Sequence, residues 1–154
     1  MVAYRILRPD DARELAILHA ATFETPWSPA ALRSELAKPT VFGMGICAAE
    51  TPERIASFVL FQRALDEAEM LTLATDPPHQ KRSFASAVLT AAFDSLRERG
   101  VTRCLLDVAA DNDPALRLYR KLGFSEDGRR HNYYHRAGEE PVDAILMSSD
   151  LTRL

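Results

Sequence analysis

A segment in the middle of the chain has the residue types that could bind phosphate. Residues 73–86 join a run typical of a β-strand to a run with helical periodicity. The N-terminus of a helix offers unpaired N–H groups and a partial positive charge, which together favour phosphate binding. The cations of this segment are Lys81 and Arg82, and the small residues that follow them are Ser83, Ala85 and Ser86. Small side chains would let a diphosphate approach the backbone, with the cations as further donors. The alternative is an ordinary solvated loop capped by a serine, and spacing alone leaves both open.

The remaining reactive side chains match no metal-binding or nucleophilic motif. His131 and His135 stand four residues apart, but no helix is predicted there and no cysteine or carboxylate cluster completes a metal site. Cys47 and Cys104 fall in apolar, strand-like runs, which predicts buried free thiols. No paired motif supports a Ser-His-Asp or Cys-His nucleophile. We therefore expect no metal and no covalent intermediate on the protein.

Periodicity along the chain predicts the elements that position the turn. Strand patterns cover 4–7, 41–49, 55–63, 69–75, 103–108, a run from 124, and 142–148, and helical patterns cover 9–23, 29–37, 84–99 and 113–122. Short turns between the strands of residues 41–75 imply antiparallel pairing. The later alternation of strand and helix implies β-α-β crossovers. The expected fold class is α/β, or α+β, with a mixed, mostly antiparallel sheet of about seven strands flanked by four helices.

Length and composition are those of a soluble globular protein. The chain has 154 residues, 47% hydrophobic and 27% charged, and we interpret residues 1–154 as a single domain. The formal net charge of −3 argues against direct binding of nucleic acid. No run is long and apolar enough for a signal peptide or a membrane span. We therefore expect a cytoplasmic protein without membrane contact.

Two motifs resemble those of the GNAT acetyltransferase superfamily. Residues 80–85, Gln-Lys-Arg-Ser-Phe-Ala, are similar to the Q/R-x-x-G-x-G/A motif of that family. Residues 112–124 are similar to its longer N-x-x-A-x-x-L-Y-x-x-x-G-F signature. Shorter motifs resemble the RimI-type branch of protein N-terminal acetyltransferases, namely Pro-Trp-Ser at 26–28, Arg-Arg-His-Asn-Tyr-Tyr at 129–134 and Asp-Ala-Ile-Leu-Met at 143–147. The resemblance covers nearly the whole chain and implies the GNAT fold.

The resemblance implies direct transfer of an acetyl group from acetyl-CoA to an amine. The implied acceptor is the N-terminal α-amino group of a ribosomal protein that begins with alanine. The alternatives are a small-molecule amine as acceptor, or a non-catalytic acyl-CoA-binding module. Asp107 lies where the branch carries a glutamate base, and Tyr119 lies where it carries a tyrosine acid. The implied cofactor-binding residues are Leu73, Ala74, Thr75, Lys81, Arg82, Ser83, Phe84, Ala85, Ser86 and Asn112, and the substrate-binding residues are Trp27, Glu69, Tyr133 and Tyr134. We expect a monomer or a homodimer.

Several of these residues also have purely structural interpretations, which the sequence leaves open. Tyr119 lies on the apolar stripe of its helix, so packing alone would explain it. Asp107 ends a strand pattern, where it could be a solvated turn residue or a structural hydrogen-bond acceptor. Glu69 could be an exposed edge charge, and Trp27 could anchor the first two helices. Residues 133–134 could simply cover the end of the sheet.

Two positions depart from the family pattern. Ser83 replaces the first glycine of the phosphate motif, and a serine there costs strain and space if the position needs positive φ. If the position is helical, serine is tolerated, and we expect binding with somewhat weaker affinity. Asp107 is one methylene shorter than glutamate, which withdraws the carboxylate by about 1.5 Å and favours a base that acts through water. A modest base suffices because an α-amino group has a pKa of about 7.7–8.0.

Overall fold

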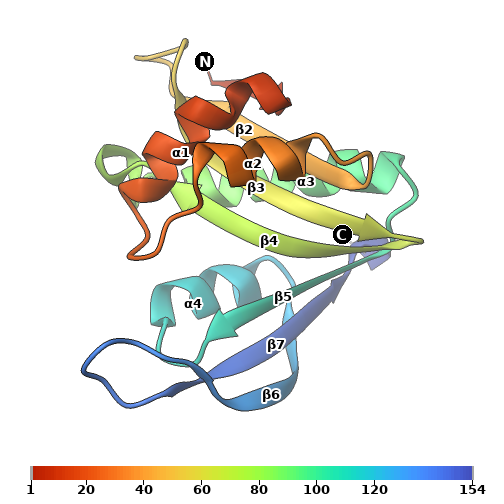
Figure 1. The fold of residues 1–154 in the computed structure, drawn as a ribbon. Coiled ribbons are helices and arrows are strands. Elements are labelled where there is room, and N and C mark those ends of the chain that lie inside the picture. The colour runs from red at the N-terminus through yellow and green to blue at the C-terminus, as the bar shows by residue number, and fades with distance from the viewer. Residues whose placement is uncertain (1, 154) are drawn as a thin grey trace.

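Seven strands form one mixed sheet (Figure 1). They are β1 (Ala3–Ile6), β2 (Val41–Cys47), β3 (Ile55–Ala64), β4 (Glu67–Thr75), β5 (Arg103–Ala109), β6 (Ser125–Tyr134) and β7 (Val142–Asp150). The computed structural model describes residues 2–153, and within them the strands lie in the order β1-β2-β3-β4-β5-β7-β6. Every neighbouring pair is antiparallel except β4 and β5, which are parallel.

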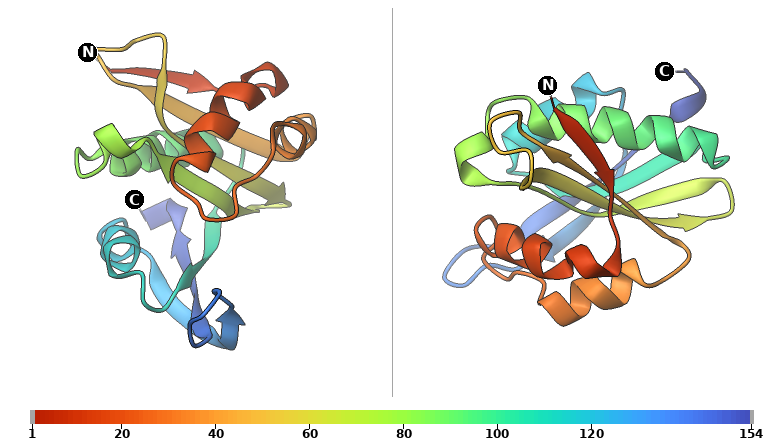
Figure 2. Two further views of the ribbon diagram at one scale, coloured as in Figure 1. Left: turned by 60° about the vertical axis from the view of Figure 1, so that its left-hand side comes forward. Right: turned by 90° about the horizontal axis from the view of Figure 1, so that it is seen from above.

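Four α-helices cover the two faces of this sheet (Figure 2). They are α1 (Ala12–Ala20), α2 (Pro29–Leu36), α3 (Phe84–Glu98) and α4 (Asp113–Lys121). Single turns of 3-10 helix occupy Pro9–Asp11, Pro77–His79 and Leu151–Arg153. The expected fold class, a mostly antiparallel mixed sheet of seven strands with four helices, is confirmed.

Alternation along the strands divides the core into two apolar layers. In β3, Phe58 and Leu60 pack in the cluster that includes α1 and α2, whereas Val59 and Phe61 pack in the cluster that includes α3 and α4. Each face of the central strands is therefore apolar, as a sheet covered by helices on both sides requires. The two predicted free thiols, Cys47 and Cys104, are confirmed as buried and unbridged.

The first helix is shorter than its sequence pattern predicts. We expected it to reach about Phe23, but α1 ends at Ala20. The N–H groups of Thr22 and Phe23 both donate to the carbonyl of His19, at 3.1 and 2.9 Å, and the first of these is the tighter 3-10 type of bond at the end of the helix. The residues between α1 and α2 consequently form an irregular loop. Within residues 2–153, no helix has the length and apolarity needed to cross a membrane.

Candidate active site

The sheet opens between β4 and β5. The two strands pair only over residues 67–69 and 103–105, whereas β3 remains paired with β4 as far as Thr75. A β-bulge that adds Leu71 to β4 lies just beyond the last paired residue, and bulges increase the local twist of a strand. Among the described residues, one edge of β4 beyond Glu69 therefore has no strand partner, and it borders the opening seen in Figure 1.

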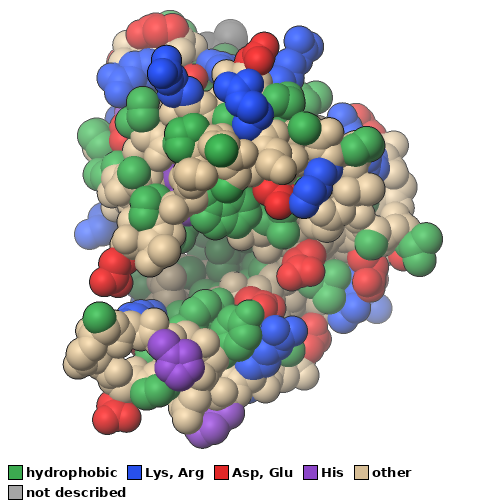
Figure 3. Space-filling model, in the orientation of Figure 1, with side chains coloured by type: hydrophobic (Ala, Val, Ile, Leu, Met, Phe, Trp, Pro, Cys, Tyr) green, Lys and Arg blue, Asp and Glu red, His purple; other side chains and the backbone are tan. Residues whose placement is uncertain are grey.

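A cleft of about 660 Å³ occupies this opening, and Figure 3 shows it as a hollow between the two halves of the molecule. Its walls come from the end of β4, the turn that follows, the first turn of α3, one face of α4 and the residues after α1. The predicted site residues that line it are Leu73, Ala74, Thr75, Lys81, Ser83, Phe84, Ala85, Ser86, Asn112 and Tyr119. A volume of this size is typical of a small-molecule or cofactor site.

The charged side chains that line the cleft are positive. Lys81, Arg117 and Lys121 line it, and no carboxylate does so among the described residues. The chain as a whole has a formal net charge of −3, so this local excess of cations is not a reflection of composition. Arg117 and Lys121 were not predicted as site residues, because nothing but their spacing along α4 distinguishes them from solvated surface charges. The cleft is therefore suited to an anionic ligand.

The turn between β4 and α3 presents its backbone to the cleft. Within residues 2–153, the N–H groups of residues 81–86 have no hydrogen-bond acceptor. Lys81 and Ser83 have φ angles of 63° and 65°, in the left-handed region. The sequence alternative in which position 83 is helical is therefore wrong, because Ser83 is the left-handed residue immediately before α3. Its hydroxyl makes no capping hydrogen bond either, so the interpretation as a serine cap is also wrong.

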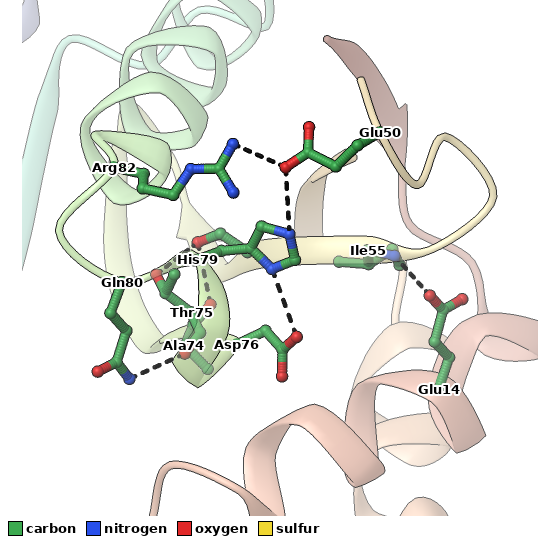
Figure 4. Close-up of polar contacts among 10 residues, drawn as sticks. Glu14, Glu50, Ile55, Ala74, Thr75, Asp76, His79, Gln80 and Arg82 are labelled. Carbon is green, nitrogen blue, oxygen red and sulfur yellow. Dashed lines mark hydrogen bonds and ion pairs between the residues drawn. The ribbon is translucent and has the colours of Figure 1, made fainter. Parts of the chain in front are cut away.

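Side chains behind the turn hold it in place (Figure 4). Gln80 donates from Nε2 to the carbonyl of Thr75 at 3.1 Å, which connects the turn to the end of β4. The guanidinium of Arg82 pairs with Glu50 at 2.7 Å and does not line the cleft, unlike Lys81. His79 approaches Glu50 at 4.0 Å on the other side, so this carboxylate connects two positions of the turn to the loop after β2. Hydrogen bonding to Arg82 contributes to a lowered pKa of Glu50, after the larger effect of its own backbone N–H.

Replacing Ser83 with glycine tests the strain in this turn. A left-handed L-residue costs about 1–2 kcal/mol, whereas glycine loses about 0.5–1 kcal/mol more chain entropy on folding. We therefore expect Ser83→Gly to raise the free energy of unfolding by about 0.5 kcal/mol, measured by denaturant titration. Ser83→Ala keeps Cβ and is the matched control, for which no gain is expected. Equal stabilities of the glycine and alanine variants would contradict strain at this position.

Tyr119 lies at the inner end of the cleft. It is 7% exposed, and its hydroxyl approaches the sulfur of Met70 in β4 at 3.8 Å, a weak hydrogen bond. Burial, with a smaller effect of Tyr134, raises the pKa of Tyr119 to about 12. The phenol is therefore fully protonated at neutral pH and retains its donor.

Asp107 and Tyr134 lie close to each other on the β5 side of the opening. Asp107 is an exposed residue of β5, whereas Tyr134 ends β6 and is half-buried. Burial raises the pKa of Tyr134, and the negative charge of Asp107 raises it further. Tyr134 in turn contributes, after burial, to the raised pKa of Tyr119. Asp107 lies within the strand, so its interpretation as a turn residue is wrong.

The other predicted acceptor residues lie around the cleft rather than in its wall. Trp27 is partly buried against the α1–α2 cluster. Glu69 is exposed at the last position where β4 pairs with β5. Tyr133 is 47% exposed, and its ring meets that of Tyr134 edge to face at 5.1 Å. Asn132 precedes them with a φ of 51°, and its N–H donates to Asp143 at 2.9 Å, which fixes the irregular end of β6.

No metal site emerges from the side chains. Across residues 2–153, no group of three or more His, Cys, Asp or Glu side chains is placed to hold an ion. His131 instead approaches Asp143 at 3.0 Å, and its side chain is 83% exposed.

Fold, cleft and sequence together identify the class of protein. Residues 12–124 match the acetyltransferase (GNAT) family, and the chain belongs to this family. The predicted resemblance to the family is thereby confirmed.

Individual relatives belong to the branch that the short motifs indicated. The chain is 36% identical over 143 residues to N-alpha-acetyltransferase RimI of Mycobacterium tuberculosis. This match covers 91% of this chain and 87% of that protein. It is 42% identical over 97 residues to ribosomal protein bS18-alanine N-acetyltransferase of Salmonella typhimurium. That match covers 62% of this chain and 64% of the relative, so it spans less than two thirds of the Salmonella protein.

Solved structures agree with the fold. The crystal structure of ribosomal-protein-S18-alanine N-acetyltransferase from Escherichia coli superimposes with a TM-score of 0.89 at 29% identity, covering 98% of this chain and 94% of that one. Arabidopsis thaliana NAA60 in complex with acetyl-CoA gives a TM-score of 0.84 at 19% identity, covering 99% of both chains. At that identity the second likeness is evidence for the fold alone.

Proposed function

We propose that this protein is an acetyl-CoA-dependent N-acetyltransferase whose acceptor is the N-terminal α-amino group of a ribosomal protein that begins with alanine. The observation that carries the proposal is the cleft, where, as far as the described part of the chain goes, free backbone N–H groups and cations meet without a carboxylate. The acceptor is proposed from the names of the relatives in Salmonella typhimurium and Escherichia coli.

The residues of the cleft fit the diphosphate and the pantetheine of acetyl-CoA. The unpaired N–H groups of residues 81–86 supply the donors that a diphosphate needs, and Lys81 adds a charge beside them. The unpartnered edge of β4 at residues 73–75 offers backbone groups for the amides of pantetheine. Asn112 caps α4 by accepting the N–H of Ala115 at 3.3 Å, and its amide nitrogen remains as a donor. In this proposal Arg82 acts indirectly, since it fixes the turn through Glu50.

The reaction then requires the protein to position an amine against the thioester and to accept the proton that the amine loses. Acetyl-CoA supplies a thioester carbonyl, which a neutral amine attacks directly. Asp107 accepts the proton of the amine through a water molecule, because an aspartate is too short for direct contact where the family carries a glutamate. Tyr119 donates a hydrogen bond to the departing sulfur. With a pKa of about 12 it is a weaker acid than a thiol, whose pKa is near 8.5, so it stabilises the thiolate without completing proton transfer.

The acceptor is held on the side of the cleft opposite the diphosphate. Trp27 and Glu69 lie toward the α1–α2 loop and β4, and Tyr133 and Tyr134 lie at the end of β6. We propose that these four side chains form the groove for the first residues of the acceptor. A small first residue such as alanine leaves room for the aromatic side chains to remain in place.

Release of free thiol from acetyl-CoA tests this function. We expect turnover with a peptide that begins with alanine, and loss of turnover when the same peptide carries a blocked N-terminus. Mass spectrometry of the product should place the acetyl group on the α-amine and not on lysine. Binding of acetyl-CoA without turnover on any peptide or small amine would instead support a non-catalytic acyl-CoA-binding module.

A further inference from the structure

A buried histidine connects the α1–α2 loop to the sheet beside the cleft. His19, near the end of α1, is 1% exposed, and both of its ring nitrogens have partners. The N–H of Trp27 donates to Nδ1 at 3.1 Å, and Nε2 lies 2.9 Å from Oγ1 of Thr72 in β4. The rings of Phe23, Trp27 and Phe58 surround the imidazole. The Phe23 ring stacks on it, with the two ring centroids 4.1 Å apart.

These partners define the tautomer of His19. A backbone N–H can only donate, so Nδ1 must be the acceptor and the ring proton must lie on Nε2. Nε2–H then donates to the hydroxyl of Thr72. Burial lowers the pKa of His19, so the ring is neutral at neutral pH, in agreement with this arrangement.

Residues 24–27 have few hydrogen bonds, although the Trp27 side chain packs against the α1–α2 cluster. Within residues 2–153, the bond from Trp27 to His19 is the only hydrogen bond made by residues 24–27. On one side of this segment, Thr22 and Phe23 line the cleft, and on the other side Ser28 begins α2. On the strand, Thr72 immediately precedes residues 73–75, which line the same cleft. His19 therefore sets the position of the loop relative to the strand that forms the cofactor wall.

We propose that His19 is a positioning residue, whose Nδ1 holds the backbone of Trp27 so that residues 24–27 form a fixed wall for the acceptor. The proposal rests on the acetyltransferase function proposed above, and it concerns the acceptor alone. A loop released from His19 must be ordered each time an acceptor binds, which weakens acceptor binding. Residues 24–27 do not line the cleft proposed for acetyl-CoA, so acetyl-CoA binding should change little.

Two amide substitutions separate the roles of the ring nitrogens. In His19→Asn the side-chain oxygen can occupy the place of Nδ1 and accept the N–H of Trp27. In His19→Gln the terminal amide takes the place of Nε2 and reaches Thr72 instead. Because a neutral hydrogen bond is worth roughly a factor of ten, we expect His19→Gln to raise the KM for an alanine-starting peptide about tenfold. The KM for acetyl-CoA should stay within about twofold in both variants, and asparagine should restore most of the acceptor affinity.

Fluorescence reports on the loop independently of activity. Trp27 is the one tryptophan of the chain, so its emission describes the surroundings of this loop alone. We expect the emission maximum to move to longer wavelength in His19→Gln, because the indole becomes more exposed, and to stay near the wild-type value in His19→Asn. Equal emission and equal acceptor KM in the two variants would overturn the proposal.

A measurement on the wild-type protein keeps the proposal testable if His19→Gln does not fold. Nitrogen-15 NMR of the histidine rings should find His19 neutral, with its proton on Nε2. A proton on Nδ1 would overturn the proposal, since Trp27 could then not donate to that atom. A wild-type protein that releases no thiol with any amine overturns the proposed function. Turnover with an acceptor KM that does not depend on position 19 overturns the role of His19 alone.

Discussion

Replacing Tyr119 with phenylalanine is expected to lower kcat about 100-fold, the lower end of what removing one hydrogen-bond donor to a developing negative charge costs. The hydroxyl is the only group removed, and its hydrogen bond to the sulfur of Met70 is weak. The ring keeps its packing against Phe124, whose centroid is 5.9 Å away. We therefore expect the KM for acetyl-CoA and the free energy of unfolding to change little. Thiol-release kinetics and thermal unfolding of the same preparation measure both effects.

Tyr4→Phe is the matched control for this substitution. Tyr4 is 49% exposed on the edge strand β1, so the same chemical change there should affect neither kcat nor stability. An unchanged kcat in Tyr119→Phe would remove Tyr119 from the mechanism. A large loss of stability would assign it to the core, which its position on the apolar stripe of α4 also allows.

The pH profile gives a second test of the same residue. Because burial raises the pKa of Tyr119 to about 12, its phenol keeps its proton throughout the neutral and mildly alkaline range. The loss of this donor therefore sets in only as the pH approaches that value. Any alkaline decline of kcat near pH 9 belongs to another group, and it should persist in Tyr119→Phe.

The order of the elements was predictable because each has its own local pattern. Phe84, Val88, Ala92 and Leu96 recur at helical spacing, and all four are buried on the sheet side of α3. Pro29 and Pro114 near the starts of α2 and α4, and Gly100 after α3 with a φ of 86°, are likewise local signals that the structure follows. Such signals do not depend on the rest of the chain.

The shape of the site depends on contacts between distant residues, and these left no signal in the sequence. The bulge at Leu71 lies just beyond the last pair of β4 and β5, but its composition resembles that of the regular strand around it. The ion pair that turns Arg82 away from the cleft depends on Glu50, more than thirty positions earlier. His19 lies in an ordinary helical pattern, and its burial and its contacts with Trp27 and with Thr72 of β4 appear only in the folded chain. The sign of φ at Ser83 was open because serine, unlike glycine, does not predict it.

Replacing Ser86 with glutamate should affect binding and stability in opposite directions. Ser86 is the third residue of α3 and lines the cleft, next to the free N–H groups of residues 81–86. A carboxylate in the first turn of a helix stabilises it by about 0.3–1 kcal/mol. The same carboxylate would repel a diphosphate by about 2 kcal/mol at close range in a partly exposed site, which weakens acetyl-CoA binding about 30-fold. Calorimetric titration and thermal unfolding without ligand measure the two effects.

Ser86→Gln separates charge from size. Glutamine has the shape of glutamate without its charge, so it should weaken binding by much less and should not gain the full helix stabilisation. The difference between the two variants should shrink as salt is added, because the repulsion is screened over about 10 Å at 0.1 M ionic strength. Equal losses of affinity in both variants would mean that the side chain only fills space. Unchanged affinity in Ser86→Glu would mean that the diphosphate does not bind at the start of α3, and the proposed orientation of the thioester toward Tyr119 would then have no support.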